Sequence, residues 1–309
     1  MIGEDLQVVA NSAPVVWQWH PEVWLLVVAV LGIGFYTTRV IAPKVVAAGG
    51  EPVTTAQRRW FVAGVVVLYL SSDWPMHDIA EEYLYSIHMV QHLLLTYVMP
   101  PLFLLATPTW LAELILGGGR FGRFFRGLSR PLLAGLTFNV LVALSHAAPI
   151  VNTSVEVGIV HYLVHAALVL ASFAMWMPVA GPLPELRIGI PQQIVYLFLM
   201  SVLPTVPAAF LTVADNPLYQ AYNHEHRLWD VNVRSDQQAA GLIMKLAGGF
   251  YLWGIITARF LTLARRTMTD RRESAVRVTT TTGTLTFDDV TRAFDETPAV
   301  DDVNRGAPS

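Results

Sequence analysis

Seven apolar segments alternate with shorter polar stretches along the chain. Most are close to the ~20 residues that an α-helix needs to cross a bilayer, and the second is the shortest. The pattern predicts an all-α fold: a polytopic membrane bundle of seven transmembrane helices. The predicted spans are residues 23–40, 60–72, 83–106, 131–147, 156–180, 191–214 and 238–263.

Lysine and arginine gather in alternate connecting segments. The other segments are nearly free of them and contain only Arg227 and Arg234. Because cytoplasmic loops carry the excess of cations, we expect the N-terminus outside and the C-terminus in the cytoplasm, which agrees with an odd number of spans. The cation-rich set consists of Lys44, Arg58, Arg59, Arg120, Arg123, Arg126, Arg130, Arg187, Arg265, Arg266, Arg271 and Arg272.

The last predicted span ends near residue 263, and the composition changes there. Residues 264–309 are polar, rich in threonine and acidic, as in "TTTTGTLTFDDV". Such a composition cannot bury enough apolar surface to fold alone. We therefore predict a seven-span transmembrane domain over residues 1–263 and a disordered cytoplasmic tail over residues 264–309, with a short helix near 287–294.

The composition narrows the class of protein further. The 309 residues are 54% hydrophobic and only 14% charged, whereas soluble domains carry about 25% charged residues. A net charge of −3 gives no reason to expect a nucleic-acid partner. The chain has no cysteine, which excludes disulfides, thiolate metal sites, iron–sulfur clusters and cysteine nucleophiles.

Five of the nine histidines fall at one predicted depth, near the outer side of the membrane. His88 and His92 are four residues apart on the third span, His161 and His165 repeat that spacing on the fifth, and His146 ends the fourth. Side chains at this spacing lie about 5–6 Å apart on one helix face, so a pair can hold one metal ion. Imidazole suits copper, zinc and iron.

The seventh span adds two candidate ligands. Asp236 lies at its outer boundary, and Met244 lies deeper, where its thioether would favour Cu(I). Each candidate has a structural alternative: a membrane histidine often bonds a neighbouring helix, and a methionine often packs in the core. We interpret His224 and His226, in "NHEHR", as part of a solvated external loop.

Four stretches together resemble a known family, the CtaG-like cytochrome c oxidase assembly factors of Gram-positive bacteria, which have seven spans. The resemblance covers roughly residues 60–263. The chain departs from the family at "ATP" (106–108), in place of a step that contains glycine, and at Lys245, beside Met244, where the family has an aromatic residue. The matching stretches are "HMVQHLLL…PPLFLLATP" (88–108), "SHAAPI…VHYLVHAAL…MWMPV" (145–179), "PLYQAY" (217–222) and "DQQAAGLIM" (236–244).

The resemblance implies a multi-pass protein of the bacterial plasma membrane that is not an enzyme. It would help to mature a haem–copper cytochrome c oxidase, receiving Cu(I) from an extracytoplasmic donor and passing it to oxidase subunits. Eight residues match the family's polar positions: His88, His92, His146, His161, His165, Asp236, Gln237 and Met244. We take all of them except Gln237 as candidate metal ligands.

Three other functions remain open from the sequence. A zinc hydrolase would use three protein ligands and an open position, with Asp73, Asp236 or Glu156 as ligand or base. A haem or quinone protein would use histidines on facing helices, although two histidines on one helix face cannot take opposite axial sites of one haem. In a metal-free assembly scaffold, the histidines would only join helices.

Overall fold

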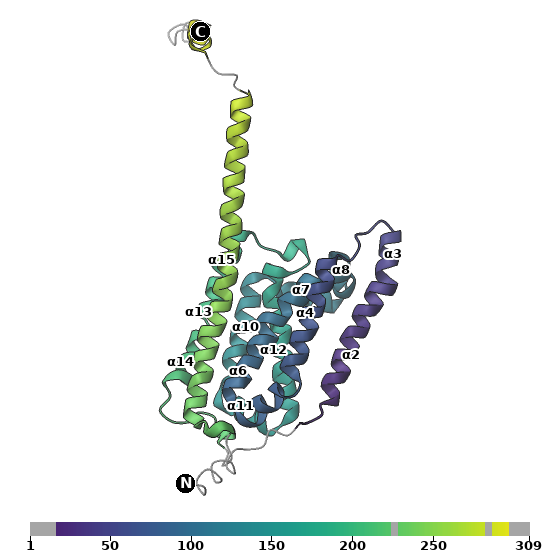
Figure 1. The fold of residues 1–309 in the computed structure, drawn as a ribbon, viewed down its shortest axis with the longest axis vertical. Coiled ribbons are helices and arrows are strands. Elements are labelled where there is room, and N and C mark those ends of the chain that lie inside the picture. The colour runs from purple at the N-terminus through teal and green to yellow at the C-terminus, as the bar shows by residue number, and fades with distance from the viewer. Residues whose placement is uncertain (1–16, 224–227, 282–285, 297–309) are drawn as a thin grey trace, which may run out of the picture. The chain divides into compact units, whose positions relative to one another are not determined.

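A computed structural model describes residues 17–223, 228–281 and 286–296, so His224 and His226 lie outside it. Within these ranges the only regular secondary structure is helical. The chain divides into two compact units, Met1–Arg259 and Phe260–Ser309, and everything that concerns the histidines lies in the first (Figure 1).

Helices lie over all seven apolar segments. The elements that cover them are α2 (Pro21–Tyr36), η1 (Thr37–Ile41), α3 (Ala42–Ala47), α4 (Thr55–Ser72), α6 (Tyr85–Leu93), η3 (Leu94–Val98), α7 (Met99–Ala106), α10 (Pro131–Ser145), α12 (Gly158–Ala180), α13 (Ile190–Val202), α14 (Thr205–Val213) and α15 (Val233–Thr281). The shorter connecting elements include α5 (Met76–Asp78), η2 (Ile79–Tyr83), α8 (Thr109–Leu116), α9 (Arg120–Leu128), α11 (Ala148–Glu156) and η5 (Gln220–Tyr222).

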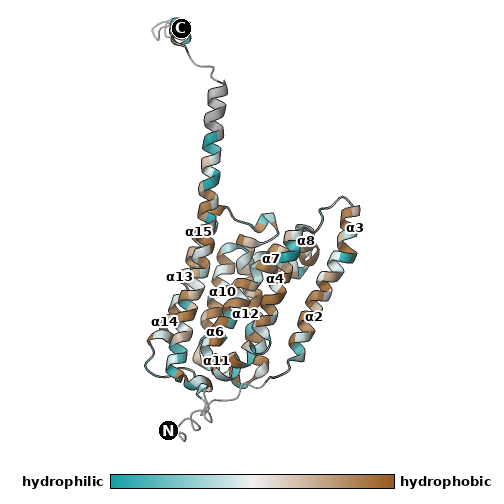
Figure 2. Ribbon diagram, viewed as in Figure 1, coloured by the Kyte–Doolittle hydropathy of each residue, from teal (hydrophilic) through white to brown (hydrophobic). Residues whose placement is uncertain are grey.

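Five helices in the described part of the chain are long and apolar enough to cross a membrane, and six if α9 and α10, bent by 85°, form one broken span. Apolar residues dominate these helices in Figure 2. The helix α4 is not among these candidate spans, because Arg58 and Arg59 in its first turns lower its mean hydropathy. The chain is therefore a multi-span helical protein, while the count of seven and the orientation stay predictions.

Prolines divide two of the long apolar segments. Pro100 and Pro101 follow the π-helical turn η3 and begin α7. In the sixth segment α13 ends at Val202, and Pro204 precedes α14. A proline donates no backbone hydrogen bond and clashes with the preceding turn, so the helix must change its geometry there.

The core of the first unit joins the third and fifth segments. Trp176 of α12 is 1% exposed, and its indole N–H donates to the carbonyl of Thr96 in η3 at 3.0 Å. The Tyr196 hydroxyl of α13 donates to the carbonyl of Met175 at 2.9 Å. A buried indole or phenol needs such a partner. The first bond fixes α12 against the segment that begins with α6, which sets the histidine geometry, and the second bond joins α13 to α12.

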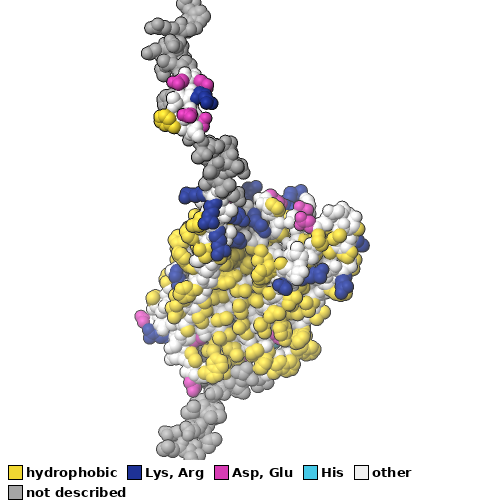
Figure 3. Space-filling view, turned by 45° about the horizontal axis from the view of Figure 1, so that its top comes forward, with side chains coloured by type: hydrophobic (Ala, Val, Ile, Leu, Met, Phe, Trp, Pro, Cys, Tyr) yellow, Lys and Arg dark blue, Asp and Glu magenta, His cyan; other side chains and the backbone are white. Residues whose placement is uncertain are grey.

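Cationic and histidine-bearing segments occupy different ends of the first unit. The arginine-rich α9 follows α7 and α8, whereas His88 and His161 lie near the first turns of α6 and α12, whose starts lie toward the other end in Figure 1. Apolar side chains cover the face shown in Figure 3, with lysines and arginines toward one end. This separation agrees with the charge pattern of the sequence.

Regular structure extends further toward the C-terminus than the sequence predicts. The helix α15 continues to Thr281, through residues predicted to be without structure. A short helix, α16 (Phe287–Glu296), lies where one is expected near 287–294. The division at residue 263 and the disorder of the tail stay predictions.

Gly241 lets α15 approach α14 closely. A Cβ atom at this position would lie 2.7 Å from the backbone oxygen of Ala208. We expect Gly241→Ala to lower the free energy of unfolding by roughly 1–3 kcal/mol, because the backbones must separate. Thermal unfolding in detergent measures this. Gly249→Ala is the matched control, since nothing lies within 4 Å of a Cβ there; equal melting temperatures for the two variants would contradict the close approach.

Candidate metal site

The two predicted histidine pairs face each other. His88 and His92 lie on α6, and His161 and His165 lie on α12. The ring centroids within the pairs are 4.5 and 4.2 Å apart. Across the helices, His92 lies 4.6 Å and His88 lies 5.5 Å from His165. The i, i+4 spacing places each pair on one face of its helix. The packing of α12 against η3 and α7 brings these two faces opposite each other.

Three imidazoles converge on one point. One ring nitrogen from each of His88, His92 and His165 lies within 4.8 Å of the others. Two nitrogens bound to one tetrahedral ion at ~2.0–2.1 Å stand roughly 3.4 Å apart, so small side-chain movements would complete a three-ligand site. We call His88, His92 and His165 the histidine triad.

Glu81, which precedes α6 in η2, bridges the two helices. Its carboxylate lies 3.1 Å from His88 Nδ1 and 3.2 Å from His161 Nδ1. Burial alone would raise the pKa of Glu81, but the two imidazoles hold it below its ordinary value. A carboxylate that accepts from Nδ1 leaves Nε2 of the same ring free to bind a metal.

Glu81 also belongs to a second donor group. Its oxygen and one nitrogen each of His161 and His165 lie within 4.8 Å of one another. Because His165 belongs to both groups, the two groups share a donor and lie side by side. The sequence analysis missed Glu81, although an acidic pair directly before the histidine-bearing span was a signal for it.

His146 lies beside the triad, with its ring 6.2 Å from that of His92. Its Nδ1 lies 2.7 Å from the Val142 carbonyl, and a carbonyl has no proton to give, so Nδ1 carries the proton. In a neutral ring Nε2 then has none, and it faces the sulfur of Met89 at 3.3 Å. An imidazole nitrogen and a thioether, both metal donors, therefore point at each other, and Met89 was not among the predicted ligands.

Met244 lies close to the histidines. It borders a small cavity of about 30 Å³ together with Met89, His92 and His146, and it packs in a core cluster with Tyr85 and Met89. A space of that size matches about one water molecule. Met244 therefore forms part of the wall of this cavity, and its role as a ligand stays a prediction.

Asp236 has a different role in the structure, and its place among the metal ligands stays a prediction. Its two oxygens accept hydrogen bonds from the backbone N–H groups of Tyr85 at 2.7 Å and Ser86 at 3.0 Å. N–H groups in the first turn of a helix have no acceptor within the helix itself. A carboxylate at this end of α6 satisfies them and interacts favourably with the helix dipole. Gln237 holds the neighbouring loop by accepting from Leu218 N at 2.8 Å. Both residues therefore join α15 to other parts of the first unit.

Two further histidines, His77 and His20, extend the cluster beyond His161. The ring of His77 lies 6.4 Å from that of His161 and 4.8 Å from that of His20. His20 Nε2 lies 2.5 Å from an oxygen of Asp78. Burial lowers the pKa of His77, which favours the neutral ring.

Fold and site together define a class: a multi-span helical membrane protein with a buried, cysteine-free histidine cluster between two of its helices. A family model described as cytochrome c oxidase caa3 assembly factor (Caa3_CtaG) matches residues 35–266. The chain belongs to this family, which confirms the resemblance and extends it into the first apolar segment. No curated protein and no solved structure shows a significant match.

Proposed function

We propose that the protein binds Cu(I) at the histidine triad and passes it to a subunit of the maturing oxidase. The observation that carries the proposal is the convergence of His88, His92 and His165, with ligand atoms within 4.8 Å of one another. The family supplies the oxidase-assembly context. The protein would act in the bacterial plasma membrane, with the triad toward the outer side.

Copper suits the donors better than the alternatives do. Imidazole binds both copper and zinc, but thioether sulfur favours Cu(I), and Met89 lies against His146 beside the triad. A zinc hydrolase was expected to use Asp73, Asp236 or Glu156 as ligand or base. Asp236 caps α6, and among the described residues none of the three belongs to either donor group. Copper is also the ion that a haem–copper oxidase must acquire.

The shared ligand suggests how the ion moves. A Cu(I) ion held by Glu81, His161 and His165 would exchange the first two ligands for His88 and His92 while keeping His165. No electron is transferred in this step. Because the triad is divided between α6 and α12, a small separation of these helices would release the ion to the next acceptor.

Copper counting tests the proposal. The protein is purified in detergent, exposed to Cu(I) under reducing conditions, washed, and analysed for metal per chain. We expect near-stoichiometric copper in the native protein and its loss in folded His88→Ala/His92→Ala. Retained zinc would favour the hydrolase, and a coloured haem adduct the haem protein. No metal would leave the metal-free scaffold.

Glu81→Gln should weaken copper binding without preventing it. Replacing a carboxylate that orients a ligating histidine typically costs 10–100-fold in metal affinity, so we expect a loss in that range in a competition with a Cu(I) chelator. The neighbouring Glu82→Gln is the matched control, because Glu82 accepts from Gln18 in an exposed contact. Equal affinities for the two variants would exclude the orienting role of Glu81.

A further inference from the structure

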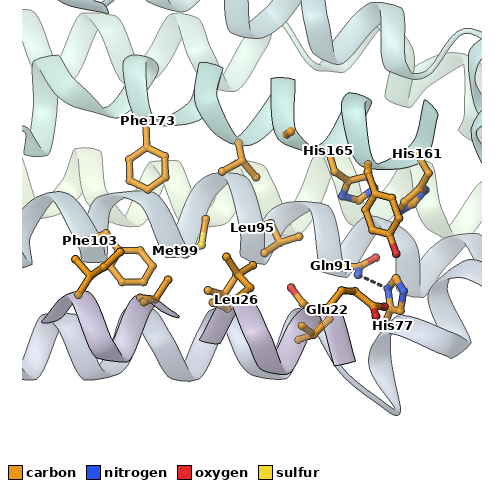
Figure 4. A pocket seen from close by; sticks show the side chains of 18 of the residues that line it. Glu22, Leu26, His77, Gln91, Leu95, Met99, Phe103, His161, His165 and Phe173 are labelled. Atoms are coloured by element: carbon orange, nitrogen blue, oxygen red, sulfur yellow. Dashed lines mark hydrogen bonds between the residues drawn. The ribbon is translucent and has the colours of Figure 1, made fainter. Parts of the chain in front are cut away.

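An elongated apolar cavity lies beside the histidine cluster and has no role in the proposed copper transfer. It encloses about 630 Å³ between α2, α4, the α6–α7 segment and α12. This volume is within the range of small-molecule sites, about 300–1,000 Å³. Its walls are almost entirely apolar side chains, among them Leu26, Leu95, Met99, Phe103 and Phe173 (Figure 4).

The polar groups of the cavity gather at one end. Figure 4 shows Glu22, His77, Gln91, His161 and His165 together at this end, with the apolar side chains running away from them. From Glu22 to Ile33, both of which line the cavity, α2 rises about 16 Å at 1.5 Å per residue. A ligand that matches this space has one apolar chain and a polar head.

The head must be uncharged. No lysine or arginine lines the cavity among the described residues, and the only carboxylate there is that of Glu22. A phosphate head would be left without a cation and would meet a negative group. Ordinary phospholipids, which also carry two chains, therefore match the cavity poorly.

Gln91 indicates that the head carries a hydroxyl group. Its amide nitrogen donates to the Ser71 carbonyl at 2.8 Å, which fixes the orientation of the amide. The opposite atom, Oε1, has no hydrogen-bond partner, although the residue is only 2% exposed. A buried acceptor without a donor is costly. An O–H group at this end of the cavity would satisfy it once a small side-chain movement opens this atom to the cavity.

The wall formed by α2 provides a route from the bilayer. The helix meets the rest of the unit through a small apolar cluster that includes Val23, Val27 and Val65. A wall held by so few buried side chains can separate at low cost compared with the central helices, so a chain could enter sideways.

We propose that this cavity binds one isoprenoid quinol, with its hydroxyl at Gln91 and its chain along Leu95, Met99 and Phe103. The proposal stands independently of copper binding. A quinol combines the single chain, the uncharged head and the O–H donor that the cavity requires, and its head would lie beside His161 and His165.

Calorimetric titration of the full-length protein in detergent tests this site. The probe is decylubiquinol kept reduced, and decanol and oxidised decylubiquinone are compared with it. We expect saturable 1:1 binding of the quinol, with affinity roughly fivefold or more above the other two because only the quinol offers a ring hydroxyl to Gln91. Gln91→Met should remove that preference.

A pair of variants on α12 locates the binding. Ala166 lines the cavity, so Ala166→Trp should fill it and reduce quinol affinity at least tenfold. Leu170 is 56% exposed and is not part of the lining, so Leu170→Trp should bind as the native protein does. Absence of saturable binding, equal binding of decanol and quinol, or unchanged binding by Ala166→Trp would each overturn the proposal.

Discussion

Oxidase activity is expected to fall at least tenfold in cells whose only copy of this protein carries His165→Ala. His165 belongs to both donor groups, so its loss removes a ligand from each position that the ion is proposed to occupy. Losing a direct ligand should cost more than the 10–100-fold typical of a supporting residue. The measurement is cytochrome c oxidation by isolated membranes, together with the copper content of the oxidase.

The control for this experiment lies on the same helix. Leu163 is 63% exposed, so Leu163→Ala should support full oxidase activity. Immunodetection must show both variants at the native level in the membrane. Normal activity and oxidase copper with His165→Ala, at native abundance, would argue against the shared-ligand route.

Asp236→Ala is expected to destabilise the protein strongly without acting on the metal ligands. The substitution leaves the N–H groups of Tyr85 and Ser86 without their acceptors, in a place where Tyr85 is 1% exposed. An unsatisfied buried donor costs about 1–3 kcal/mol, so the two together should lower the free energy of unfolding by about 2–5 kcal/mol. Thermal unfolding in detergent measures the effect.

Asp236→Asn separates a helix cap from a metal ligand. An amide retains one acceptor oxygen, so we expect a smaller loss of stability than with alanine and unchanged copper per folded chain. Loss of copper from folded Asp236→Asn, with stability intact, would return Asp236 to the ligand set.

Local patterns predicted the features that depend on one helix. The apolar segments located the helices, and the i, i+4 spacing placed His88 with His92 and His161 with His165 on single faces. The shared depth of the two pairs then indicated that the pairs meet. In the structure the rings of His92 and His165 are 4.6 Å apart. The apolar segments did not settle the number of spans for two reasons. Arg58 and Arg59 shorten the apolar part of α4, and α10 counts as a span only together with α9, from which it is bent by 85°.

Features that depend on tertiary contacts were beyond the sequence. Asp236 serves as a cap only because the start of α15 lies against the start of α6, far away in the chain. Met89 faces His146, and the rotation of α6 about its axis decides this contact. A helix that is apolar on all sides gives little signal in the sequence of which face points inward. Glu81 reaches two histidines because η2 folds back beside α6 and α12.

X-ray absorption at the copper edge of the Cu(I)-loaded native protein tests the central claim most directly. We expect a first shell made of nitrogen, with the multiple-scattering pattern of about three imidazoles, because the histidine triad provides three ring nitrogens. A shell that contains a sulfur neighbour and fewer imidazoles would move the ion to Met89 and His146. Failure of the washed protein to retain any copper would contradict copper binding altogether.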